Sequence, residues 1–75
     1  MSGFIQAKDI VHDALTQATN GQKGKARVRM FDFSKLRLSL PEVQKALTEL
    51  EAENIISNVK MISSEVEYDL LEPKQ

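Results

Sequence analysis

The stretch Leu38–Ile56 constrains the fold most, because it carries signals for both ends of a single helix. Ser39 is placed to be the N-cap, and Glu42 lies three residues later, so that the two can form a capping box. Pro41 falls in the first turn, where its missing N–H costs little. The apolar residues that follow recur at helical spacing and predict one buried face, made of Val43, Ala46, Leu47 and Leu50. We therefore predict a helix over Ser39–Glu53.

Three elements are predicted before this helix. Phe4–Thr19 is expected to be helical, and its apolar residues at helical spacing define a buried stripe of Ala7, Ile10, Val11, Ala14, Leu15 and Ala18. Arg27–Phe33 alternates at first between apolar and charged residues, which predicts a short strand. Ser34–Leu38 is predicted to lie in a helix of one to two turns, with Asp32 or Ser34 near its start, which would place Leu36 and Leu38 inward.

The C-terminal part of the chain predicts a β-hairpin. Ile55–Ile62 is rich in β-branched residues, and Val59 and Met61 are expected on one face. Glu65–Leu71 alternates, with inward positions predicted at Val66, Tyr68 and Leu70. A lone hairpin is marginal in water, so we expect it to pack on the helices and to be joined by the strand at Arg27–Phe33. The predicted fold class is α+β, in the order helix, strand, short helix, helix, strand, strand, with a three-stranded antiparallel sheet.

Length and composition indicate one small domain without disulfides. The chain has 75 residues and no cysteine, and its apolar fraction of 41% suffices for a small core. We expect residues 1–75 to form a single domain, with an ordered core at about 4–71, a flexible loop at 20–26 and a flexible tail at 72–75. No apolar run approaches the ~20 residues of a membrane span, and the N-terminus lacks the pattern of a signal peptide. A cytoplasmic location is therefore expected, and the size is typical of phage, plasmid or accessory bacterial proteins.

The net charge of −1 conceals an uneven distribution. Residues 1–37 carry seven Lys or Arg and three Asp, a sum of +4, whereas residues 38–75 carry three Lys and eight Asp or Glu, a sum of −5. Most of the positive charge lies in one segment that contains Lys23, Lys25, Arg27, Arg29, Lys35 and Arg37. Such a segment can bind an anionic partner, or it can be a solvated surface that pairs with the acidic half of the chain.

The order of elements and the residues of the capped helix resemble a known superfamily. The residues that carry the resemblance are Leu38, Ser39, Val43, Leu47, Leu50, Glu51, Asn54 and Ile56. They are similar to the winged helix-turn-helix regulators of the MarR and GntR kind, in which a helix begins Leu-Ser-x-x-x-Val and ends near Leu-Glu-x-x-Gly-x-Ile. Asn54 replaces the family's glycine, which is tolerable because Asn also adopts the left-handed conformation. The helix at Ser34–Leu38 is shorter than usual, and the turn that would be the wing, Ser63-Ser64-Glu65, is not basic.

The resemblance implies a DNA-binding function. In this superfamily the second helix of the motif enters the major groove, with its N-terminal residues nearest the bases. The matching positions here are Ser39, Pro41, Gln44, Lys45 and Thr48, of which Gln44 would read adenine and Lys45 guanine or a phosphate. Around them, phosphate contacts are expected from Lys23, Lys25, Lys35 and Arg37. The implied partner is duplex DNA.

Other interpretations remain open at the level of sequence. Every amphipathic helix has an outward polar face, and Arg27 and Arg29 are expected to pair with acidic residues of the last strand rather than with DNA. The acidic pI of about 5.7 and the neutral wing favour an alternative function, a winged-helix module that binds another protein. A homodimer is also possible, with Phe4 and Ile5 as a small contact surface.

Nothing in the sequence supports catalysis. His12 is the only histidine, there is no cysteine, and no carboxylate pair has a recognisable acid–base arrangement. We therefore expect a protein that is not an enzyme, with no metal and no cofactor. The aromatic residues Phe31, Phe33 and Tyr68 are expected in the core rather than as a stacking platform for single strands.

Overall fold

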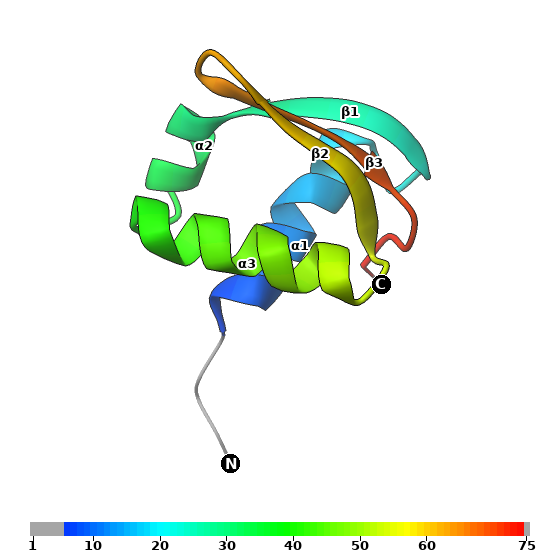
Figure 1. Ribbon diagram of the computed structural model, residues 1–75, viewed down its shortest axis with the longest axis horizontal. Helices are drawn as coiled ribbons and strands as arrows, with labels where there is room; N and C mark the ends of the chain where they lie inside the picture. The colour runs from blue at the N-terminus through cyan, green and yellow to red at the C-terminus, as the bar shows by residue number, and fades with distance from the viewer. Residues whose placement is uncertain (1–5, 75) are drawn as a thin grey trace.

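The computed structural model describes residues 6–74, which form three helices and one three-stranded antiparallel sheet (Figure 1). The elements are α1 (Ala7–Ala18), β1 (Gly24–Arg29), α2 (Met30–Ser34), α3 (Leu40–Ala52), β2 (Ile56–Ile62) and β3 (Glu65–Leu70). The predicted α+β class, the order of elements and the antiparallel sheet are confirmed. No helix in this described part of the chain combines the length and the apolar character needed to cross a membrane.

The sheet has the strand order β1-β3-β2, with β1 and β2 as its edges. Helices α1 and α3 cover the same face of the sheet (Figure 1). The predicted alternation of β3 is confirmed, because Val66, Tyr68 and Leu70 are buried against the helices. The Tyr68 hydroxyl donates a hydrogen bond of 2.7 Å to the carbonyl of Leu15 in α1, and burial raises the pKa of Tyr68 to about 12. This bond fastens the centre of the sheet to the first helix.

Helix α3 confirms the capped helix predicted from the sequence. The Ser39 Oγ accepts the backbone N–H of Glu42 at 3.3 Å, and the Glu42 Oε1 accepts the backbone N–H of Ser39 at 2.9 Å, so both halves of the capping box are present. These bonds lower the pKa of the Glu42 carboxyl. The predicted face of Val43, Ala46, Leu47 and Leu50 is buried. At the other end, Asn54 has a φ of 60°, the left-handed conformation expected there.

The predictions for residues 27–38 are wrong in their boundaries. Strand β1 already contains Gly24 and ends at Arg29, so Met30–Phe33 is helical rather than extended. Pairing stops because Arg29 lies opposite Glu65, the first residue of β3, and the chain beyond Glu65 has turned into the hairpin. The N–H of Met30 instead donates to the carbonyl of Ser64 at 2.8 Å, and the chain then enters α2.

The short helix therefore begins two to four residues earlier than predicted, at Met30 rather than near Asp32 or Ser34, and buries a different side chain. Phe33 is 2% exposed and enters the core, whereas Leu36 is partly exposed and Leu38 only packs against the core edge. Phe31, expected in the core, is 67% exposed and points away from it.

Helix α1 confirms most of its predicted stripe, with two differences. Ala18 is exposed and Thr16 is buried in its place. The Thr16 hydroxyl donates to the carbonyl of His12 and accepts the backbone N–H of Lys74, so a polar side chain is satisfied at this position. The predicted helix start at residues 4–5 lies outside the described residues.

The C-terminal tail lies along α1. The His12 Nε2 atom is 2.6 Å from the carbonyl oxygen of Glu72, and Lys74 bonds Thr16 as described above. Residues 72–74 thus contact the first helix, and the flexibility that the sequence suggests for this tail stays a prediction.

A β-bulge interrupts β2. The register with β3 shifts between Ser57 and Lys60, and Asn58 within the bulge has a φ of 52°. Because the bulge adds a residue, Ile56 is buried while Ile62, six residues later, is 41% exposed, although an uninterrupted strand would place both on one face.

Candidate nucleic-acid interface

The predicted recognition residues Pro41, Gln44, Lys45 and Thr48 are all exposed on α3 and are called the α3 face below. They lie on the side of α3 opposite its buried residues, as the helical period requires. The face is therefore available to a partner. Three of its residues nevertheless divide between two concave surfaces that flank the helix, with Lys45 on one and Gln44 and Thr48 on the other.

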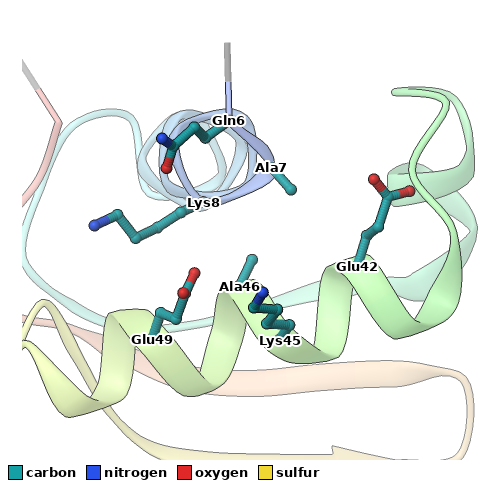
Figure 2. A pocket seen from close by; sticks show the side chains of 7 residues that line it. All are labelled: Gln6, Ala7, Lys8, Glu42, Lys45, Ala46 and Glu49. Atoms are coloured by element: carbon teal, nitrogen blue, oxygen red, sulfur yellow. The ribbon is translucent and has the colours of Figure 1, made fainter. Parts of the chain in front are cut away.

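On one flank, a hollow of about 210 Å³ separates the first turn of α1 from α3 (Figure 2). Its lining consists of Gln6, Ala7, Lys8, Glu42, Lys45, Ala46 and Glu49. The two small residues Ala7 and Ala46 lie on facing sides of the two helices. The hollow carries two lysines and two glutamates, so its charges balance and it has no preference for anions or cations.

On the other flank, a groove of about 160 Å³ runs between α3 and β2. Its helix side is lined by Gln44, Leu47, Thr48 and Glu51, and its strand side is lined by Val59 and Met61. Gln44 and Thr48 are therefore the residues of the α3 face on the side of the hairpin. The Thr48 hydroxyl donates to the carbonyl of Gln44 at 3.0 Å and keeps only acceptor capacity for a ligand.

Ser39 has a structural role at the start of α3. Both its hydroxyl and its backbone N–H are used in the capping box. The hydroxyl retains its own hydrogen, so a contact to a phosphate is compatible with the cap.

Lys35 and Arg37 lie in the connection between α2 and α3, next to the N-terminal end of α3. The Lys35 Nζ is 3.9 Å from the Asp32 carboxylate and 5.4 Å from the centre of the Phe31 ring, which partly compensates its charge. Arg37 is exposed, has a left-handed backbone with a φ of 62°, and makes no ion pair with any described residue.

Lys23 and Lys25, from which phosphate contacts are expected, do not lie near the hairpin turn. Gly24 is opposite Leu70 at one end of the sheet, whereas Arg29 is opposite Glu65 beside the turn. The strand between them is roughly 17 Å long at about 3.3 Å per residue. Lys23 and Lys25 are therefore at the end of the sheet remote from the N-terminus of α3, because β1 runs towards the turn and not away from it.

The ion-pair prediction is confirmed for Arg27 and not for Arg29. Arg27 lies 3.3 Å from the Glu67 carboxylate and 3.4 Å from that of Glu65, and the hydrogen bond and charge of Glu67, with a contribution from Glu65, raise its pKa. Arg29, two residues on, makes no ion pair within residues 6–74 although it is opposite Glu65 in the register. Glu65 is already occupied by Arg27.

Most cations without an ion pair in the described residues lie around the hairpin and the first half of α3, and Lys23, at the remote end of the sheet, is the exception. Within residues 6–74, no carboxylate pairs with Arg29 at the end of β1, Arg37 before α3, Lys45 on α3 or Lys60 on β2. Sequence reasoning gave no site role to Lys60, and its alternation in β2 showed only that it points outward. The acidic residues of α3 lie mainly towards its far end, at Glu49, Glu51 and the C-cap Glu53. The N-terminal half of α3 is thus the more positive half.

Comparisons of the chain with protein-family models, with curated proteins and with solved structures found no match.

Proposed function

We propose that the chain is a winged helix-turn-helix domain that binds duplex DNA through the N-terminal half of α3. The order of elements, the strand order β1-β3-β2 and the succession of α2 and α3 fit that architecture. In this proposal α3 is the recognition helix and the β2–β3 hairpin is the wing. At 1.5 Å per residue α3 is about 20 Å long, and a helix fits the major groove, which is ~12 Å wide.

The observation that carries the proposal is the charge gradient along α3. Unpaired Arg37 and Lys45 and the positive end of the helix dipole lie at its N-terminal half, where phosphates are favoured. Glu49 and Glu51 lie towards its C-terminal half, where phosphates are repelled. DNA would therefore meet the helix by its N-terminus, with Gln44 and Lys45 facing base edges and Arg37 and Lys60 the backbone.

The test compares two double variants that remove the same charge from opposite ends of the molecule. In the first, Arg37→Gln and Lys45→Gln remove two cations beside the α3 face. In the matched control, Lys23→Gln and Lys25→Gln remove two cations at the remote end of the sheet. Binding to a mixed-sequence duplex is measured by fluorescence anisotropy over a series of salt concentrations.

We expect the first double variant to bind DNA roughly tenfold more weakly, which corresponds to about 1.4 kcal/mol. The slope of log K against log salt should also fall by about 0.9, since Arg37 is the phosphate contact that this variant loses and each such contact contributes ~0.9. The control should bind nearly as tightly as the unmodified chain. Equal losses in the two variants would show general electrostatic attraction without a site, and no binding at low salt would refute DNA binding altogether.

A further inference from the structure

Large apolar side chains are exposed at the end of the molecule that carries α2 and the hairpin turn. Figure 1 shows α2, the start of α3 and the turn at this same end. The bond from the Met30 N–H to the carbonyl of Ser64 holds α2 against the turn. The exposed residues that we call the apolar end are Phe31, Leu36, Leu40 and Ile62, whereas Met61, also exposed, lines the groove between α3 and β2. Leu71, the matching exposed leucine elsewhere, lies after β3, beyond the opposite end of the sheet.

Phe31 is the most exposed of these side chains, and the fold gives it no packing role. Phe33 supplies the aromatic ring that α2 contributes to the core, and Phe31 is 67% exposed with only the Lys35 ammonium above its ring. An exposed aromatic ring at the same end of the molecule as exposed leucines is a feature that protein interfaces use as an anchor. Duplex DNA gives such a ring no partner, because its phosphates attract the cations and leave the apolar surface in water.

The charges around the apolar end decide what can cover it. Residues 29–37 contain three cations, Arg29, Lys35 and Arg37, and one carboxylate, Asp32, a net charge of +2. Arg29 and Arg37 make no ion pair in the described part of the chain. A second copy docked by the same surface would set these cations against one another, which disfavours self-association here. A partner with carboxylates around its apolar residues would be attracted instead.

We propose that the apolar end docks an acidic amphipathic segment of another protein. The segment carries aromatic or aliphatic side chains that cover Phe31, Leu36 and Leu40, and its flanking Asp or Glu residues pair with Arg29 and Arg37. The apolar end is small compared with a standard interface, so the complex is expected to be of the transient kind. This surface shares Arg37 with the proposed DNA site but none of the residues of the α3 face, and peptide binding does not depend on DNA binding.

The test begins with a phage-displayed library of random peptides selected against the intact chain. We expect enriched peptides to combine acidic residues with Leu, Phe or Trp. A synthetic copy of the most enriched peptide is then titrated into the ¹⁵N-labelled protein and followed by NMR. Shifts are expected at residues 29–40 and at the hairpin turn, and a scrambled peptide of the same composition should bind at least tenfold more weakly.

Two variants test whether the selected peptide binds the apolar end specifically. Phe31→Ser should weaken the selected peptide at least tenfold, whereas the matched control Leu71→Ser should change its affinity less than twofold. Dispersed NMR spectra of both variants establish that they are folded. Failure to enrich acidic peptides, equal binding of the scrambled peptide, or unchanged affinity of Phe31→Ser would overturn the proposal. The proposal would also be overturned if Phe31→Ser weakened duplex DNA binding as much as it weakened peptide binding. The apolar end would then belong to the DNA interface.

Discussion

Helices α2 and α3 follow one another in the chain, but α3 is held largely by its own sequence and α2 by its neighbours. Helix α3 has 13 residues, a complete capping box and four buried side chains in one stripe. Helix α2 has five residues, no side-chain cap and one buried side chain, Phe33. A helix of one turn has too few internal hydrogen bonds to offset the entropy of ordering its backbone. It therefore forms only where tertiary contacts fix both of its ends.

This difference separates two kinds of surface as well. The α3 face is presented by a rigid, locally specified helix, so its exposed residues follow from the period of the buried ones. The apolar end is presented by a segment whose conformation depends on the hairpin turn, through the contact of Met30 with Ser64. Substitutions that act on one helix and spare the other test this distinction.

The largest effect is expected from the two phenylalanines of α2. Phe33→Ala should lower the free energy of unfolding by about 3–5 kcal/mol, because it leaves a cavity where a 2%-exposed ring packs. Phe31→Ala, two residues away, should change it by less than about 0.5 kcal/mol because that ring is exposed. Urea denaturation followed by circular dichroism measures both. Similar losses in the two variants would mean that the burial assigned to α2 is incorrect.

An intermediate effect is expected at the helix caps. Ser39→Ala should lower the free energy of unfolding by about 1 kcal/mol, because it removes the acceptor for the Glu42 N–H at the start of α3. Ser34→Ala in α2 serves as the control, since its hydroxyl bonds only the carbonyl of Phe31 within the same turn. We expect the control to cost a few tenths of a kcal/mol. If Ser34→Ala lowered the free energy of unfolding as much as Ser39→Ala does, the proposed contrast between α2 and α3 would be contradicted.

The capping box also predicts a pH dependence. The pKa of Glu42 is lower in the folded chain than its ordinary value of 4.5, because its carboxylate accepts the Ser39 N–H. Its contribution to stability is therefore fully present above pH 4.5 and is lost as pH falls through the lowered pKa. Denaturation at neutral and acidic pH should show this loss in the unmodified chain and a smaller loss in Glu42→Gln. If both proteins lost equal stability at acidic pH, Glu42 would not be the source of the pH dependence.

The smallest effect is expected at the left-handed residues that follow α2 and α3, Arg37 and Asn54. The left-handed conformation costs an ordinary residue about 1–2 kcal/mol, and glycine avoids this but loses about 0.5–1 kcal/mol of backbone entropy. Arg37→Gly should thus raise stability by up to ~1 kcal/mol, and Asn54→Gly should change it less because Asn tolerates this conformation. Thermal unfolding measures both variants. If Arg37 is retained for a phosphate contact, Arg37→Gly will be stable and yet bind duplex DNA more weakly.

The sequence specified the parts of the candidate site that depend on local signals. Exposure of Gln44, Lys45 and Thr48 followed from the helical period, and the pairing of Arg27 followed from its place opposite acidic positions. It did not specify which cations of the segment from Lys23 to Arg37 would lie at each end of the molecule. Lys25 and Arg37 are twelve residues apart in the chain, and only the direction of β1 within the sheet sends them to opposite ends.

By itself, then, the sequence determined α3 with its caps and the alternation of β3, because a capping box and a regular period act over a few neighbouring residues. Only the tertiary structure decided where β1 ends, that α2 follows it, and which phenylalanine is buried. The physical reason is a contact between distant residues. Strand β3 begins at Glu65, so β1 has no partner beyond Arg29, and the N–H of Met30 turns to Ser64 at the hairpin. A backbone group that loses its strand partner must find another, and that requirement sets the start of α2.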